Sequence, residues 1–190
     1  MLGWLIFALW LTLVLYWGFA AKALKRQFGR SWIWWREIGV RLAFFSLVVQ
    51  MLRGAVGANA AQFAWLYGAS TSTKMGFIGL VLCVLGIGLA ILGRSSLGAN
   101  WPMPNSSSEH GELITSGPYA YVRHPIYGGM LLAIVGSALA QSVLWLAPLV
   151  LYGPYFIRSA RLEEKFLSEH FPQLYRSYRT RTKMLLPFVI

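Results

Sequence analysis

The sequence is poor in charged residues and above all in acids. Charged residues make up 12% of the 190 residues, and all six acids are glutamates because the chain contains no aspartate. Soluble domains carry about 25% charged residues, so this composition is not that of an ordinary soluble protein. Without an aspartate the chain also has no Ser-His-Asp catalytic set.

Cysteines and closely spaced histidines are scarce as well. Cys83 is the only cysteine, which excludes an intrachain disulfide and a cysteine metal cluster. No second histidine stands at a metal-ligand spacing from His124, and no Gly-rich phosphate loop follows a strand. We therefore expect neither a bound metal nor hydrolytic chemistry.

The chain is instead rich in apolar and basic residues. Hydrophobic residues make up 57% of it, and the formal net charge is +11. The basic residues cluster beside apolar runs, which is the pattern expected at the cytoplasmic face of a membrane. We therefore expect the lipid bilayer, and not nucleic acid, to be the partner of this positive charge.

The apolar runs predict an all-α integral membrane protein with about five transmembrane helices. About 20 apolar residues span a hydrocarbon core of about 30 Å. The first three spans are expected at 2–20, 38–52 and 76–93, with the first one a retained helix and not a signal peptide. Residues 126–158 are too long for one span, and Gln141-Ser142 near the middle predict a tight helical hairpin.

Small residues recur along two of these segments at helical spacing. Gly76, Gly79, Cys83, Gly86, Ala90 and Gly93 form one stripe on the third span, and Gly129, Ala133, Gly136 and Ala140 form another on the first arm of the hairpin. In lipid such stripes let helix backbones approach closely and gain packing contacts. We expect the two stripes to face each other.

The chain divides into two regions at residue 93. Residues 1–93 hold the first three helices, and residues 94–190 hold a polar loop, the hairpin and a basic C-terminal cap. Five crossings place the N-terminus outside, with the 22–41 connection, the 94–125 loop and the tail in the cytoplasm, in agreement with their excess of Lys and Arg. The two polar segments then face the same compartment.

The polar groups at the two ends of the hairpin are the candidates for chemistry. Arg123-His124-Pro125 and Tyr127 stand at its entrance, and Glu163-Glu164 follow its second arm. Taken alone, the first group is typical of an interfacial anchor, and the second is typical of a pair of carboxylates in helix salt bridges with Arg158, Arg161 or Lys165. A tight hairpin would instead bring a histidine, tyrosines and a carboxylate together at one membrane face.

The tail adds a series of aromatic and basic residues. Phe171, Tyr175, Arg176 and Tyr178 follow one another at short intervals. We interpret this series as a surface or lid near the polar groups.

Four segments carry a resemblance to a known family. "LGANW" (97–101), "GELITSGPYAYVRHPIYGG" (111–129), "RLEEKFL" (161–167) and "FPQLYRSY" (171–178) resemble the signature of the isoprenylcysteine carboxyl methyltransferases and the related integral-membrane phospholipid methyltransferases. The resemblance covers residues 94–185, about half of the chain. The pattern is specific for this superfamily but not for a substrate.

The resemblance implies a methyltransferase that uses S-adenosyl-L-methionine, bound in a cytoplasm-facing pocket under the C-terminal segment. With this donor, we expect His124, Tyr127, Arg158 and Glu163 to be the catalytic residues. The implied cofactor contacts are Gly111, Glu112, Leu113, Ile114, Tyr119, His124, Pro125, Ile126, Tyr127, Glu163 and Glu164.

Two positions depart from the family pattern. The arginine that meets the substrate carboxylate in the family falls on Ser159 here, with Arg158 one residue away, and Phe171-Pro172 replace the usual Phe-Gly. We expect Arg158 or Arg123 to orient an anionic acceptor. The first departure weakens the inference of a prenylcysteine substrate.

The resemblance favours carboxyl O-methylation of a lipid-like acceptor of the isoprenylcysteine type. A carboxylate is already ionised at neutral pH and needs no base, whereas an amine must lose a proton, with His124 or a tyrosine as the candidate base. The alternatives are a phospholipid or amine N-methyltransferase and a non-catalytic membrane scaffold that retains the motif.

Overall fold

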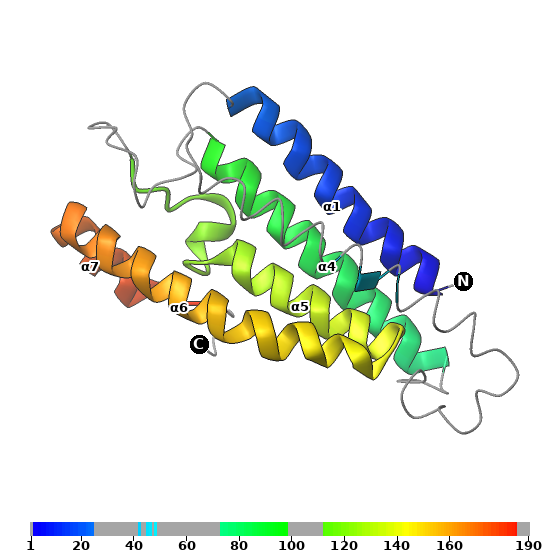
Figure 1. Ribbon diagram of the computed structural model, residues 1–190. Coiled ribbons are helices and arrows are strands. Elements are labelled where there is room, and N and C mark those ends of the chain that lie inside the picture. The colour runs from blue at the N-terminus through cyan, green and yellow to red at the C-terminus, as the bar shows by residue number, and fades with distance from the viewer. Residues whose placement is uncertain are drawn as a thin grey trace, which may run out of the picture.

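The computed structural model describes residues 2–24, 42, 45, 46, 48, 73–98 and 112–185. Within these residues the protein is all-helical, as predicted, with α1 (Leu2–Leu24), α4 (Thr73–Leu97), α5 (Pro125–Ala140), α6 (Leu146–His170) and α7 (Pro172–Arg181). Two short 3-10 turns, η3 (Gly117–Ala120) and η4 (Val143–Trp145), precede α5 and α6. The long helices lie side by side, and α7 folds back against the last turns of α6 (Figure 1).

In the described part of the chain, three helical segments are long and apolar enough to cross a membrane: Leu2–Ala20, Thr73–Leu97 and Val143–His170. They confirm the first and third predicted spans and the second arm of the hairpin. The α5 helix is apolar but has only 16 residues, or about 24 Å at 1.5 Å per residue. The predicted second span, 38–52, lies outside the described residues except for four positions.

The two stripes of small residues face each other, as expected. A Cβ built on Gly86 would lie 2.5 Å from the backbone of Gly129 and Ala133, and one built on Gly136 would lie 2.5 Å from the backbone nitrogen of Cys83. Helices in lipid gain no hydrophobic free energy by associating with each other, so van der Waals contact at such close range is what holds them together. The α4–α5 pair is the rigid support on which the start of α5 is placed.

The predicted hairpin turns at Gln141-Ser142. Gln141 is the C-cap of α5, and Ser142 has an extended backbone and accepts a hydrogen bond from Leu144 N. The Gln141 side chain is buried, accepts a hydrogen bond from Trp145 Nε1 at 2.7 Å and donates to Ser46 O at 3.3 Å. The tip is therefore fixed by polar contacts, and the start of α5 and the end of α6 meet at the opposite end of the bundle (Figure 1).

Candidate functional site

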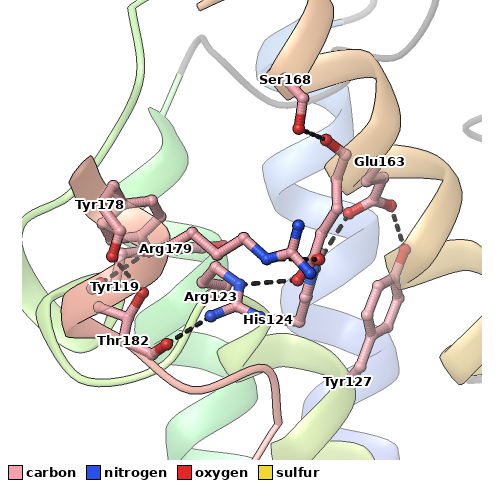
Figure 2. A network of polar contacts seen from close by, with 10 residues as sticks. Tyr119, Arg123, His124, Tyr127, Glu163, Ser168, Tyr178, Arg179 and Thr182 are labelled. Atoms are coloured by element: carbon pink, nitrogen blue, oxygen red, sulfur yellow. Dashed lines mark hydrogen bonds and ion pairs between the residues drawn. The ribbon is translucent and has the colours of Figure 1, made fainter. Parts of the chain in front are cut away.

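The site is built around the turn that leads into α5. The η3 turn ends at Ala120, and His124 is the N-cap of α5, with Pro125 at the first helical position. A proline is favoured there because the first N–H groups of a helix have no partner within the helix. This turn places the His124 side chain opposite the last turns of α6, where Glu163 lies (Figure 2).

A histidine, a tyrosine and two carboxylates converge at this point. His124 Nδ1 lies 3.3 Å from Glu163 Oε2, and His124 Nε2 lies 3.4 Å from Glu164 Oε1. The Tyr127 hydroxyl donates a hydrogen bond to Glu163 Oε1, and the rings of His124 and Tyr127 stack with centroids 5.5 Å apart. The two ends of the hairpin therefore share one site, as the sequence predicted.

The two glutamates differ in exposure. The Glu163 side chain is 32% exposed, whereas that of Glu164 is 11% exposed and that of His124 only 4%. A ligand entering the site can therefore reach the Glu163 carboxylate, which lies at its edge. Glu164 is covered by protein.

The carboxylates control the charge of the histidine. Burial would lower the pKa of His124, but Glu163 and Glu164 more than reverse this effect, so that its pKa is raised from the ordinary value. The neighbouring acids thus favour the imidazolium form. In that form both ring nitrogens carry a proton, and Nδ1 lies within ion-pair distance of Glu163 and Nε2 within ion-pair distance of Glu164.

Tyr119 is a further buried polar residue close to Glu163. Burial and the negative charge of Glu163 raise the pKa of Tyr119 well above its usual value, so the hydroxyl stays protonated at neutral pH. The Tyr178 hydroxyl donates to Tyr119 O at 2.7 Å, and burial raises the pKa of Tyr178 to about 12. Both tyrosines are therefore neutral groups across the physiological range.

Glu164 has partners that the sequence did not indicate. Its Oε1 accepts a hydrogen bond from Arg123 Nε at 2.7 Å, and its Oε2 lies 4.0 Å from Arg179 Nε. The alternative interpretation paired these glutamates with cations of their own helix, but Glu164 lies on the buried face of α6 with Phe156 and Ala160, and the arginines described at its carboxylate come from other segments.

Arg123, one of the two cations predicted to orient an acceptor, is engaged by protein groups in the structure. Its side chain is 10% exposed and binds both Glu164 and the carbonyl of Thr182 (Figure 2). Arg158, the other candidate, is exposed on α6.

The remaining predicted residues lie along the approach to this turn. Pro125 and Ile126 are buried in the first turn of α5 and pack against Gly93. Glu112 is exposed, and Leu113 and Ile114 are half-buried in an irregular segment. The predicted contact at position 111 lies outside the described residues.

The aromatic residues of the tail point inward. Tyr175 and Tyr178 are buried on α7, whereas Arg176 is exposed. The Tyr175 hydroxyl is buried and has no hydrogen-bond partner among the described residues. Of the series predicted as a surface or lid, Tyr175 and Tyr178 thus form the inward face of α7, whereas Arg176 lies on its outer face.

A model of the phospholipid methyltransferase family matches residues 75–174, more than half of the chain. The chain belongs to this family. Its members are membrane methyltransferases that use S-adenosylmethionine, and the resemblance noted in the sequence is confirmed. The matched region contains α5, α6 and every residue of the His124–Glu163 cluster.

Metal-resistance proteins and isoprenylcysteine methyltransferases are among the proteins similar to the chain. The cobalt-zinc-cadmium resistance protein CzcN of Cupriavidus metallidurans is 35% identical over 57% of this chain and 49% of its own length. The protein-S-isoprenylcysteine O-methyltransferase B of Arabidopsis thaliana is 34% identical over 43% of this chain and 42% of its own length.

A solved structure of a eukaryotic intramembrane Ras methyltransferase, an isoprenylcysteine carboxyl methyltransferase, has a similar fold. Its TM-score is 0.52 and its identity 28%, over 61% of this chain and 43% of that one. The chain spans less than half the length of each of these three proteins. With the helices described above, this likeness establishes a multi-pass integral membrane protein.

Proposed function

We propose that this protein is an S-adenosylmethionine-dependent methyltransferase of the membrane, acting on a lipid-like acceptor. The observation that carries this proposal is the convergence of His124, Tyr127 and Glu163 at the open end of the hairpin, inside the region that matches the family. The active site is proposed to face the cytoplasm.

The residues present fit the methyl donor. S-adenosylmethionine supplies a methyl group on a positively charged sulfonium, and it also carries an amino group, a carboxylate and a nucleoside. The accessible carboxylate of Glu163 suits the positive groups, and the imidazolium of His124 suits an anionic or hydroxyl group. The buried Tyr175 hydroxyl, without a partner among the described residues, is a further polar atom available at the cover of the site.

These residues act by binding and alignment. Glu163 holds the positive region of the donor, His124 and Tyr127 fix the orientation of Glu163, and α7 excludes water from the reacting centre. Methyl transfer in line needs mainly such alignment and exclusion of water, so a catalytic acid–base pair is not required.

The protonation state of the site favours a carboxylate acceptor over an amine. An amine would need a base, but the neighbouring carboxylates favour the imidazolium form of His124, and the Tyr119 hydroxyl stays protonated. A carboxylate arrives ionised and needs no base. We therefore propose carboxyl O-methylation of an isoprenylcysteine-type acceptor, with the exposed Arg158 as the cation that meets it at the membrane surface.

Transfer of a labelled methyl group tests the proposal. Purified protein in detergent is incubated with methyl-labelled S-adenosylmethionine and separate panels of prenylcysteines, fatty acids and aminolipids. We expect label in the prenylcysteines, as a base-labile ester, and its loss in Glu163→Gln but not in the control Glu169→Gln, which alters an exposed glutamate of the same helix. Label only in aminolipids would refute carboxyl methylation and favour N-methylation. No transfer with any panel would favour a non-catalytic scaffold.

A further inference from the structure

We propose that Arg123 is a positioning residue that fastens the C-terminal segment over the donor site, and that Glu164 serves this fastening whereas Glu163 binds the donor. The proposal rests on the proposed function for the role of Glu163. Glu163 and Glu164 are adjacent and look like one pair in the sequence, but the proposal gives them different roles.

Three successive backbone carbonyls of the segment after α7, here called the tail, accept hydrogen bonds from two residues of the turn before α5. Arg123 Nη1 donates to Thr182 O, Arg123 N donates to Lys183 O at 2.8 Å, and His124 N donates to Met184 O at 3.0 Å. The tail therefore runs beside the turn as a short parallel bridge between Val122 and Lys183. His124, whose imidazole faces Glu163, is therefore bound through its backbone N–H to the segment after α7.

The guanidinium of Arg123 also binds α6. Its Nε donates to Glu164 Oε1 at 2.7 Å while its Nη1 binds the tail (Figure 2). A guanidinium can bridge two acceptors in fixed directions, which an ammonium group on a flexible stem does poorly. Arg123 thus joins three segments that are distant in sequence: the turn, the end of α6 and the residues after α7.

Within the described residues, Glu164 pairs with arginine side chains and Glu163 does not. Arg123, His124 and Arg179 surround its two oxygens, and its side chain is 11% exposed. Among the described residues, Glu163 contacts Tyr127 and His124, and its side chain is 32% exposed. A donor can therefore reach Glu163 without breaking an existing ion pair with arginine, whereas contact with Glu164 would displace one.

Two contacts that do not involve Arg123 also hold α7 and the tail against the site. The Tyr178 hydroxyl of α7 binds Tyr119 O, and the backbone of Leu185 lies against Gly128, where any side chain would collide with the Leu185 carbonyl. Opening the tail would break all of these contacts together. The proposed consequence is that the donor site is complete only while the tail is docked.

The test compares tail docking with donor affinity in matched variants. Tail docking is measured without ligand, as the rate of trypsin cleavage after Arg179, Arg181 and Lys183, followed by mass spectrometry. Donor affinity is measured by calorimetry with S-adenosylhomocysteine. The variants are Arg123→Gln, Glu164→Gln, their double variant and Glu163→Gln, with Arg161→Gln as the control for loss of an exposed cation on α6.

We expect Arg123→Gln and Glu164→Gln to speed tail cleavage and to weaken S-adenosylhomocysteine binding by roughly tenfold each, because each breaks the buried Arg123–Glu164 ion pair by removing one partner. The double variant should bind more tightly than Glu164→Gln, because it removes both charges. Glu163→Gln should lose binding but keep slow tail cleavage. Equal behaviour of the two glutamate variants, or unchanged cleavage in Arg123→Gln, would overturn the proposal.

The pH dependence of binding separates positioning from a merely structural role. Removing the Arg123 guanidinium takes away a positive charge near His124 and leaves Glu164 to pair with the His124 ring, which Glu163 and Tyr127 still face. Both changes should raise the pKa of His124. The pH midpoint of S-adenosylhomocysteine binding should therefore rise in Arg123→Gln and return toward the wild-type value in Arg123→Lys. An unchanged midpoint in Arg123→Gln would contradict this role.

A milder variant covers the case in which Arg123→Gln does not fold. Tyr178→Phe removes only the hydrogen bond from α7 to Tyr119, and we expect a smaller increase in tail cleavage; no increase would count against the fastening. Failure of wild-type protein to bind S-adenosylhomocysteine would reject the proposed function alone, because the cleavage comparison needs no donor.

Discussion

At the scale of single residues, the environment of His124 determines what the site can do. The sequence predicted that this imidazole and the glutamate pair would meet, since a tight hairpin returns its two ends to the same face. The division between Glu163 and Glu164 was not predicted. A signal was present, because Glu164 continues the i, i+4 series of Phe156 and Ala160 on the buried face of α6.

The raised pKa of His124 predicts how stability depends on pH. A group whose pKa is raised on folding contributes stability that is fully present below its unfolded value, about 6.5, and is lost as pH rises through the folded value. Thermal unfolding of detergent-solubilised protein should therefore show stability falling as the pH rises above about 6.5. The fall should be smaller in His124→Gln, and an identical slope in both proteins would contradict the assigned ion pairs.

At the scale of helices, the sequence predicted the close approach of α4 and α5 correctly. The pattern is readable because small residues recur every three or four positions on both segments, and only such residues permit backbone contact. The docking of the segment after α7 on the turn before α5 left no such pattern in the sequence. The tail binds the site turn through the carbonyls of Lys183 and Met184, and backbone acceptors of this kind are available to any residue type.

The α4–α5 contact predicts different outcomes for two neighbouring glycines. Gly86→Ala places a methyl group 2.5 Å from the backbone of α5, whereas Gly88→Ala meets nothing within 4 Å. Overpacking of this kind costs about 1–3 kcal/mol, so thermal unfolding should occur at a lower temperature in Gly86→Ala and stay near the wild-type value in Gly88→Ala. Equal effects would mean that the two helices are farther apart than described.

At the scale of the whole molecule, charge predicts orientation in the membrane. Seven basic residues lie between Arg158 and Lys183 against three acids, and the site, α7 and the tail lie at one end of the bundle (Figure 1). The positive-inside rule then places this end in the cytoplasm. The five-crossing arrangement behind this prediction includes the 38–52 span, which the described residues do not cover.

Reporter fusions in a bacterial host test the predicted orientation. A green fluorescent protein attached after residue 190 should fluoresce, because it folds only in the cytoplasm, and an alkaline phosphatase at the same position should be inactive. The opposite pair of results would place the candidate site on the outer face, away from cytoplasmic S-adenosylmethionine.

The central claim is that the cluster of His124, Tyr127 and Glu163 binds the methyl donor. A ligand that binds only the folded state raises its stability by RT ln(1 + [L]/Kd). The most direct measurement is therefore the unfolding temperature in detergent with and without S-adenosylhomocysteine, for wild type and Glu163→Gln. The account predicts a concentration-dependent rise in wild type that is lost in the variant; no rise in wild type, or the same rise in both, would contradict it.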